Sequence, residues 1–268
     1  MKALHRIFSL LLLLYCTAFA SRVTAADATD KPFEPEVGQA GKDVVWVPTP
    51  PVLVEKMLDV ARVTPQDYVM DLGSGDGRNI IAAAKRGARA LGIEYNPDMV
   101  ALSRRMAETA GVADKAQFVQ GDMYEADISN ATVMALFLLP DNLNKLAPKF
   151  LALKPGTRIV ANQFAVTGWA PDETGKADGD CGSWCTWLLY IVPARVTGRW
   201  RLKQGELELE QKFQMITGTL TADGVSTSIE NGRLRGDQIT FTIGGTEYSG
   251  RVSVDAMSGS SWTATRMR

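Results

Sequence analysis

Residues 71–77 read Asp-Leu-Gly-Ser-Gly-Asp-Gly, and this stretch decides the fold. It overlaps the end of a short apolar run at 68–72, which is typical of a buried strand. Glycine at every second position lets a ligand approach the backbone closely. The spacing departs from the Gly-x-Gly-x-x-Gly fingerprint that binds pyrophosphate, and the carboxylates of Asp71 and Asp76 would repel such a group. The loop instead suits a ligand with a cationic amine or sulfonium.

Short apolar runs alternate with helical segments around this loop. Strands are expected at 68–72, 90–93, 117–119, 131–139 and 158–164, and helices at 79–86, 97–110 and 143–153. A short strand at 44–47 and a helix opened by Pro50 and Pro51 precede them. The alternation predicts an α/β fold, a doubly wound, Rossmann-like and mostly parallel sheet with helices on both faces. We expect this domain to span residues 49–195.

The pattern changes near residue 196. From there to residue 268, short strand-forming runs are punctuated by Gly, Asn and Asp, and helical periodicity is lost. Hairpin turns are expected at Asn231–Gly232, Gly236–Asp237 and Gly244–Gly245. Residues 196–268 are therefore predicted to form a small C-terminal antiparallel β domain, either a small sheet or an open barrel.

The N-terminus has the composition of a signal peptide. Basic residues precede an apolar run at 7–20, and Val23-Thr24-Ala25 has the form of a cleavage site. The run is short for a membrane span, which needs about 20 residues. We predict a signal peptide at 1–25, an extended lead-in at 26–48, and export to the periplasm or the exterior. A membrane anchor through residues 7–20 is the alternative.

Composition excludes several classes of protein. The 268 residues carry a net charge of -1, which argues against a nucleic-acid-binding surface. His5 is the only histidine, so a Ser-His or Cys-His hydrolase and a four-ligand zinc site of Cys and His are not expected. After export two cysteines would remain, Cys181 and Cys185. They can form a small loop disulfide in an oxidising compartment or stay as free thiols.

Acidic residues follow three successive predicted strands. Asp71 ends the first strand, Glu94 ends the second, and Asp122 follows the third. An acid at the position of Glu94 commonly binds ribose hydroxyls. Asp122 could reach an adenine amine while Met123 packs against the ring. Three acids in this arrangement indicate a nucleoside ligand more strongly than the glycines alone.

This constellation resembles the seven-strand, S-adenosylmethionine-dependent methyltransferases. Within them, the chain resembles the lysine methyltransferases that act on the mitochondrial ATP synthase c subunit and the adenine nucleotide translocase. The similarity rests on Val47-Pro-Thr-Pro50, on residues 71–78, on Phe137-Leu-Leu-Pro140 and on Arg158–Phe164 with Trp169-Ala-Pro171. It covers about residues 44–194 and leaves out the C-terminal β region.

The resemblance implies transfer of a methyl group from S-adenosylmethionine to a lysine amine of a protein substrate, without nucleic acid. The implied cofactor-binding residues are Thr49, Pro50, Asp71, Gly73, Ser74, Gly75, Gly77, Glu94, Asp122 and Met123. The candidate substrate residues are Phe137, Leu139, Pro140, Asp141, Asn142, Asn162 and Trp169. No residue is assigned as catalytic and no metal is implied.

Two questions stay open from the sequence. A non-catalytic binding or interaction protein with a methyltransferase-like fold is the alternative function. The export signal also conflicts with the cofactor, because S-adenosylmethionine is made in the cytosol. The tryptophans Trp169, Trp184 and Trp187 could line a substrate groove, but packing in the core or an interface is the favoured interpretation.

Overall fold

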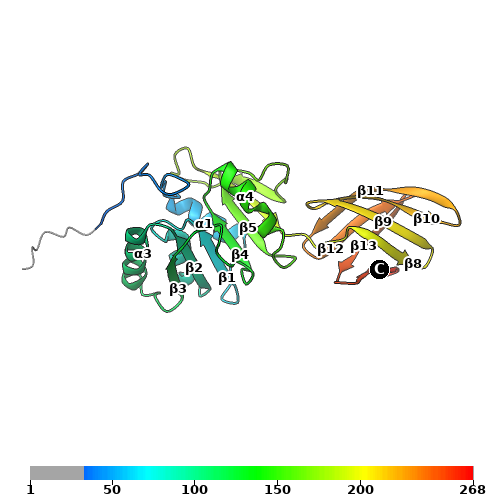
Figure 1. Cartoon of the computed structure of the whole chain (residues 1–268), viewed down its shortest axis with the longest axis horizontal. Coiled ribbons are helices and arrows are strands. Elements are labelled where there is room, and N and C mark those ends of the chain that lie inside the picture. Colours follow the sequence, from blue (N-terminus) through cyan, green and yellow to red (C-terminus); the bar gives the residue numbers. More distant parts are fainter. Residues whose placement is uncertain (1–32, 268) are drawn as a thin grey trace, which may run out of the picture. The chain divides into compact units, whose positions relative to one another are not determined.

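The computed structural model describes residues 33–267, so the predicted signal peptide lies outside the described residues. A seven-stranded sheet and then a β-barrel follow along the chain, both within the compact unit that begins at Pro35 (Figure 1). The first part contains α1 (Pro51–Val60), β1 (Tyr68–Leu72), α2 (Arg78–Lys85), β2 (Arg89–Glu94), α3 (Pro97–Thr109), β3 (Ala116–Gln120), β4 (Val133–Leu136), α4 (Pro140–Phe150), β5 (Arg158–Asn162), β6 (Glu173–Lys176) and β7 (Thr186–Ile191). Among residues 33–267, none of the helices has the length and apolar character that a membrane span requires.

The strand order of the sheet is β3-β2-β1-β4-β5-β7-β6. The first five strands in this order run parallel, whereas β7 is antiparallel to β5 and β6 is antiparallel to β7. The predicted doubly wound, mostly parallel sheet is therefore confirmed. The order reverses between β1 and β4, and ligands of such sheets bind outside the carboxyl ends of the strands at that point.

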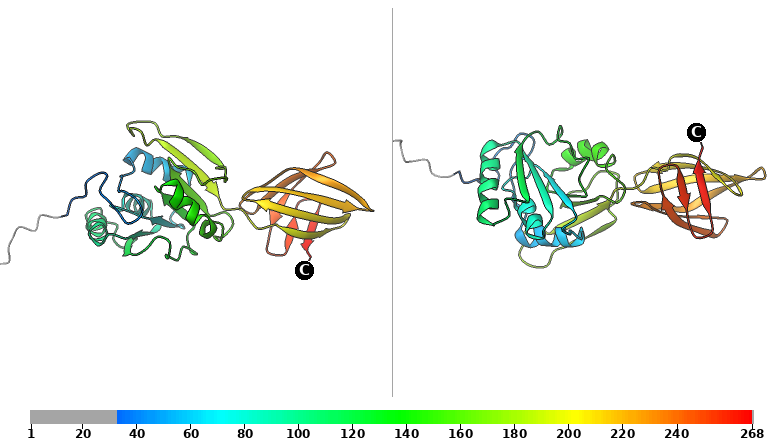
Figure 2. Two further views of the ribbon diagram at one scale, coloured as in Figure 1. Left: turned by 45° about the horizontal axis from the view of Figure 1, so that its top comes forward. Right: turned by 90° about the horizontal axis from the view of Figure 1, so that it is seen from below.

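The two faces of the sheet are buried by different helices (Figure 2). Val69 packs into a core with α1, α2 and α3, while its neighbours Met70 and Leu72 pack into a second core with α4. This alternation arises because successive strand residues point to opposite faces. The sheet is thus fixed from both sides, and only its edges and the strand ends remain for binding.

Several sequence-based boundaries are wrong. The strand predicted at 131–139 is only four residues long, and α4 begins at Pro140 rather than at residue 143. Proline suits the first turn of a helix, where its missing N–H needs no partner. The strand expected at 44–47 is reduced to a single bridge between Ala40 and Val45. Strands β6 and β7 complete the seven strands that the resemblance implies, but no sequence pattern located them.

The predicted C-terminal antiparallel β domain is confirmed, but its strands form a closed barrel instead of a small sheet or an open barrel. It consists of β8 (Gly198–Leu202), β9 (Gly205–Lys212), β10 (Met215–Ala222), β11 (Val225–Arg235), β12 (Gln238–Ile243), β13 (Thr246–Val252), β14 (Ala256–Ser258) and β15 (Thr263–Arg266). Pairing of β15 with β8 closes it around buried side chains such as Trp200 and Phe241. The predicted boundary at 195–196 falls between β7 and β8.

One of the three predicted hairpin turns is wrong. Gly236–Asp237 and Gly244–Gly245 do connect successive strands, but Asn231–Gly232 lies inside β11 as a bulge. Asn231 has a φ of +53°, and a Cβ on Gly232 would lie 2.3 Å from the carbonyl oxygen of Ile216. The pair therefore allows β11 to approach β10 closely. Bulges and turns favour the same residue types, which is why this pair resembles a turn in the sequence.

A buried carboxylate fixes the amino end of β1. Asp67 forms an ion pair with Arg158 of β5 and accepts hydrogen bonds from Thr132 Oγ1 at 2.7 Å and from the Thr64 amide at 2.8 Å. Burial alone would raise the pKa of Asp67. The hydrogen bonds from Thr132 and Thr64 and the charge of Arg158 outweigh burial, so the net pKa is lowered.

We expect Asp67→Ala to lower the free energy of unfolding by about 3 kcal/mol at pH 7, because it removes a buried acceptor of three partners and leaves the half-buried guanidinium of Arg158 without its carboxylate. A group with a lowered folded-state pKa stabilises the protein above its unfolded pKa of about 3.9, and this contribution is lost as the pH falls. The difference in the free energy of unfolding between the variant and wild type, measured by urea denaturation, should therefore become smaller below about pH 4. The matched control is Asp59→Ala, which removes an exposed pair with Arg86 and should cost less than about 1 kcal/mol. Equal effects of the two substitutions would contradict the role of Asp67.

Candidate active site

A pocket lies at the carboxyl ends of β1, β2 and β3, and every residue that lines it falls between Gln39 and Phe137. Most of the predicted cofactor residues line this pocket, namely Thr49, Asp71, Gly73, Ser74, Gly75, Glu94, Asp122 and Met123. Pro50 and Gly77 do not line it. The structure thus brings together residues from three strand ends, as expected for parallel strands whose carboxyl ends share one edge.

The glycines of the loop at 73–77 are required by the backbone conformation as well as by the space that a ligand needs. Gly73, Gly75 and Gly77 have φ values of +72°, +56° and +80°, a region that side chains disfavour. A Cβ on Gly75 would lie 2.6 Å from Trp46 Nε1, and one on Gly77 would lie 2.6 Å from the ring of Phe118. Gly77 therefore serves the turn into α2 and its packing on β3, rather than direct approach of a ligand.

Glu94 is oriented before any ligand arrives. Its Oε2 accepts a hydrogen bond from the Gly75 amide at 2.9 Å, and its Oε1 accepts one from the Asn96 amide at 2.9 Å. The side chain is half-buried at the end of β2 and lines the pocket. A carboxylate held by two backbone amides keeps lone pairs for the hydroxyls of a ribose, because each oxygen can accept more than one hydrogen bond.

Asp122 is already engaged in an ion pair. Its Oδ2 lies 2.5 Å from Lys42 Nζ, and its Oδ1 accepts a hydrogen bond from the Tyr124 amide at 2.8 Å. The hydrogen bond from Lys42 lowers the pKa of Asp122. A ligand amine at this carboxylate would therefore share it with Lys42.

Asp71 is a buried carboxylate with little compensation. Asn79 Nδ2 donates to its Oδ2 at 3.0 Å, whereas Asp71 Oδ1, Ser74 Oγ and Asn79 Oδ1 are buried without a hydrogen-bond partner. Burial raises the pKa of Asp71 well above its usual range, and the charges of Glu94 and Asp76 add to this. Unsatisfied buried polar atoms are costly, so this cluster is built for hydrogen bonds from a ligand.

One wall of the pocket was not predicted from the sequence. The segment 39–47, interpreted as part of an extended lead-in, supplies nine lining residues that include Lys42 and Trp46. Arg78, which is not among the predicted site residues, bridges the Asp76 carboxylate and the Thr49 carbonyl oxygen, with a distance of 2.6 Å to the latter. No local pattern could reveal these contacts. The tryptophan before the Val-Pro-Thr-Pro motif was the one available signal.

The candidate substrate residues divide into three groups. Phe137 lines the pocket, whereas Leu139, Pro140 and Asp141 are exposed at the start of α4. Asn142 and Asn162 are buried, and Asn142 Nδ2 donates to the Tyr124 hydroxyl at 2.7 Å. Trp169 lines no part of the pocket. It packs against Tyr190 and stacks on Phe213, with ring centroids 5.4 Å apart, as favoured for a packing residue.

Comparisons with known proteins decide the family. The profile of the ANTKMT methyltransferase domain matches residues 71–173. A protein-lysine N-methyltransferase of Saccharolobus islandicus is 42% identical over 153 residues, which cover 56% of this chain and 94% of that protein. The chain belongs to the family of S-adenosylmethionine-dependent protein-lysine N-methyltransferases.

Two further relatives bear on the site. The Mus musculus lysine N-methyltransferase named for the ATP synthase c subunit is 35% identical over 48% of this chain, but the match spans only 54% of that protein. A crystal structure described as an RNA methyltransferase from Salinibacter ruber contains S-adenosyl-L-homocysteine. It is 47% identical, covers 56% of this chain and 96% of its own, and has a TM-score of 0.52. The methyltransferase's cofactor is accordingly S-adenosylmethionine.

The pocket of this methyltransferase fits that cofactor chemically. The buried and unpartnered oxygens of Asp71, Ser74 and Asn79 suit the donors of a cationic amine, and Glu94 suits ribose hydroxyls. We infer that these residues hold S-adenosylmethionine, with Met123 and Trp46 as apolar walls. Two acids beside a largely buried loop would stabilise a positively charged ligand in particular.

We expect Asp71→Asn and Glu94→Gln each to weaken S-adenosylhomocysteine binding by about 10- to 100-fold in isothermal titration calorimetry. Each removes a charge-assisted hydrogen bond of about 1.5–3 kcal/mol. The control Glu108→Gln lies on an exposed position of α3 and should bind like wild type. Wild-type affinity in both folded variants would show that the pocket is assigned wrongly.

The same Asp71→Asn variant should melt at or above the temperature of ligand-free wild type at pH 8. A folded-state pKa above the unfolded value means that the carboxyl group favours folding below about pH 3.9, and this contribution is lost as the pH rises through the folded pKa. Asparagine avoids that loss at pH 8. A melting temperature clearly below wild type in differential scanning calorimetry would contradict the electrostatic cost assigned to Asp71.

Proposed function

We propose that the protein transfers a methyl group from S-adenosylmethionine to the side-chain amine of a lysine in another protein. The observation that carries this proposal is the 42% identity to the Saccharolobus protein-lysine N-methyltransferase over 94% of that protein. Relatives named for the ATP synthase c subunit and the adenine nucleotide translocase are also lysine methyltransferases. The acceptor of this chain is therefore proposed to be lysine, while its partner protein is not specified by these names.

Methyl transfer to an amine does not require a strong acid or base from the protein. The bound cofactor supplies an electrophilic methyl group on a sulfonium. Asp71 and Glu94 orient the ligand through the amine and ribose, and Phe137 forms the wall of the pocket next to the end of β4. Alignment of reacting groups and exclusion of water supply much of the rate enhancement in such a displacement, so a strong general base is not required.

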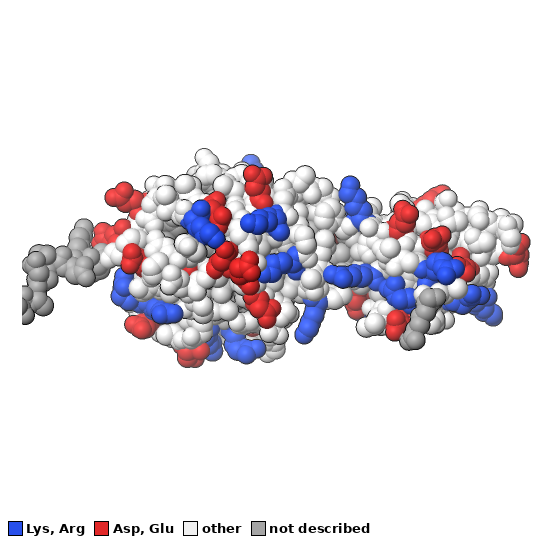
Figure 3. All heavy atoms as spheres, viewed as in Figure 1, with Lys and Arg blue, Asp and Glu red and all other residues white. Residues whose placement is uncertain are grey.

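RNA methylation is the second candidate, because the similar Salinibacter structure is described as an RNA methyltransferase. Charge favours a protein acceptor. The chain has a net charge of -1. In the face seen in Figure 3, basic and acidic side chains lie side by side over the first part of the chain, and basic side chains gather along the barrel. Several barrel arginines, among them Arg233, Arg235 and Arg251, form ion pairs with acids. An RNA-binding enzyme normally presents a basic stripe or patch to the phosphates.

Incubation with tritium-labelled S-adenosylmethionine tests the acceptor. We expect label in a lysine-rich protein such as histone, and background counts with total RNA. Label should be lost after the lysine amines of the histone are acetylated with acetic anhydride, because the resulting amide nitrogen is not nucleophilic. Mass spectrometry should locate the methyl groups on lysine. The Glu94→Gln variant is the control for contaminating activity. Label in RNA alone would support the second candidate, and cofactor binding without any transfer would support the non-catalytic alternative.

We also propose that the protein is exported through residues 1–25. Two features support this: the signal-like composition of the N-terminus and a disulfide between Cys181 and Cys185, a bond that persists mainly in oxidising compartments. Expression of the full chain in a bacterial host with a periplasm should yield a periplasmic protein that begins at residue 26 by N-terminal sequencing. An intact N-terminus in the membrane fraction would favour the anchor through residues 7–20, and a soluble cytosolic full-length chain would contradict both.

A further inference from the structure

We propose that Phe137, Phe164 and Trp184 form the site that receives the lysine side chain of the acceptor, and that the Cys181–Cys185 disulfide holds one wall of this site in place. The inference deepens the proposed function and rests on it for the identity of the acceptor. We call these three aromatic residues the aromatic cluster.

The aromatic cluster joins three separate parts of the chain next to the cofactor pocket. The ring centroid of Phe137 lies 6.3 Å from that of Phe164 and 5.4 Å from that of Trp184, and the latter two lie 6.1 Å apart. Phe137 follows β4 and lines the pocket, while Phe164 follows β5. All three side chains are only half-buried. The cluster is therefore continuous with the pocket and still accessible to a ligand.

The turn that presents Phe164 carries strain. The Phe164 amide donates to the Asn162 carbonyl oxygen at 2.7 Å across Gln163, whose φ is +65°. A γ-turn with a positive φ at its central residue is rare, and such conformations typically cost about 1–3 kcal/mol. Backbone strain of this kind gathers at ligand sites.

The same turn carries polar atoms without partners. Asn162 Nδ2, Asn162 Oδ1 and Gln163 Oε1 are buried and make no hydrogen bond. Amide oxygens in this state gain from an N–H donor, and a lysine amine brings such donors. Strain and unsatisfied acceptors at one turn thus point independently to a polar ligand beside the aromatic cluster.

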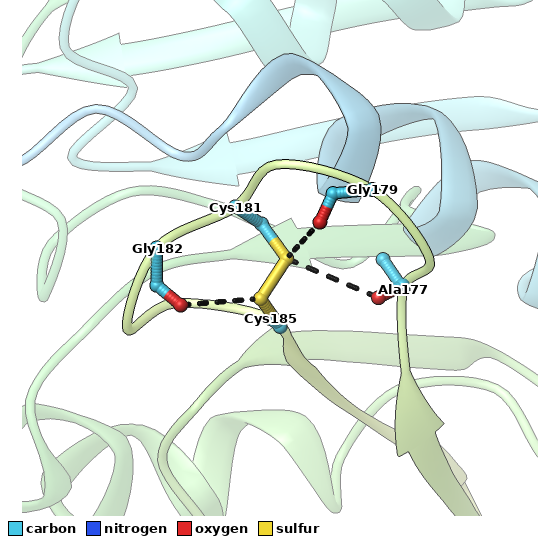
Figure 4. The surroundings of a disulfide bond; sticks show 5 residues. All are labelled: Ala177, Gly179, Cys181, Gly182 and Cys185. Atoms are coloured by element: carbon cyan, nitrogen blue, oxygen red, sulfur yellow. Dashed lines mark hydrogen bonds between the residues drawn. A yellow bond between two sulfur atoms is a disulfide. The ribbon is translucent and has the colours of Figure 1, made fainter.

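The disulfide fixes the third ring. It closes a loop between β6 and β7 (Figure 4). Trp184 immediately precedes Cys185 and so belongs to the closed segment. The Trp184 amide donates to the Cys181 carbonyl oxygen at 3.0 Å, and the Ala177 amide donates to the Cys185 carbonyl oxygen at 2.9 Å. The loop also contains Gly179 and Gly182, both with positive φ, so without the covalent bond its backbone would have wide freedom.

The chemistry of the aromatic cluster matches a lysine. Aromatic faces attract ammonium and N-methyl groups, and tryptophan does so most strongly, while the aliphatic chain of lysine packs against the rings. Asp178 and Asp180 are exposed in the same loop, and Asp141 is exposed just after β4. Exposed carboxylates on the two segments that carry Trp184 and Phe137 favour a cationic side chain over a phosphate or a lipid surface with anionic head groups.

The first test uses kinetics on the full-length mature protein, with histone as the acceptor. Trp184→Ala should lower kcat/KM for histone about tenfold, mainly through KM, while the calorimetric Kd for S-adenosylhomocysteine stays within twofold. Trp184→Phe should restore most of the loss, and Trp262→Ala, a half-buried tryptophan of the barrel, should leave both quantities unchanged. Unchanged kcat/KM in Trp184→Ala overturns the inference. A loss of S-adenosylhomocysteine binding also overturns it, because Trp184 would then support the cofactor pocket.

The second test changes the disulfide alone. Dithiothreitol transfers two electrons and two protons to the Cys181–Cys185 bond, which becomes two thiols while the reagent closes to its cyclic disulfide. Reduction should lower the kcat/KM of wild type to the level of Trp184→Ala. The double variant Cys181→Ser and Cys185→Ser should have the same low kcat/KM with and without dithiothreitol. Full activity after complete reduction would contradict the role of the disulfide.

A binding test does not depend on catalysis. The indole N–H signal of Trp184 can be assigned in a ¹⁵N spectrum by its loss in Trp184→Phe. In the presence of S-adenosylhomocysteine, Nα-acetyl-lysine methylamide should shift this signal more than the norleucine analogue, which lacks the amine. Equal shifts or none would overturn the inference. A selective shift without methyl transfer to lysine would instead contradict the proposed function and leave the lysine site intact.

Discussion

The burial of Asp71 at the end of β1 is the constraint on which the site depends. The carboxylate is almost fully removed from water, has one side-chain donor in Asn79, and lies near two further acids. Burying charge of one sign without a partner is unfavourable, and a cationic ligand would offset this cost. The fold therefore contains a buried carboxyl group whose negative charge is not compensated by neighbouring residues. This uncompensated charge favours a cationic ligand.

The surrounding loop is organised so that this deficit persists in a defined geometry. The amides of Gly73 and Ser74 donate to the Ile93 carbonyl oxygen at 2.8 and 3.0 Å, and the Gly75 amide donates to Glu94. The end of β2 thus fixes the loop after β1. Trp46 closes over Gly75 from the segment before α1, and Arg78 ties the loop to Thr49. Preorganisation of this kind reduces the entropy that a ligand must lose on binding.

Sequence patterns predicted the features that depend on residues close together in the chain. The acids at strand ends, the position of β1 and the change to an antiparallel region near residue 196 all followed from periodicity and turn residues. Contacts between segments that are far apart in the sequence could not be predicted from these patterns. Gly77 was assigned to the ligand, but it packs on Phe118, and the turn signal Asn231–Gly232 is a bulge because β10 approaches it closely. The wall formed by segment 39–47 was missed for the same reason, since nothing local indicates that a lead-in folds over a loop about 30 residues away.

The most direct test of the central claim is a crystal structure of the protein with S-adenosylhomocysteine. We predict that the ligand lies at the carboxyl ends of β1, β2 and β3, with its ribose hydroxyls within hydrogen-bonding distance of Glu94 and its amine next to the glycine loop at Asp71. A well-defined ligand at another place, or one whose ribose and amine make no contact with these two acids, would contradict the account.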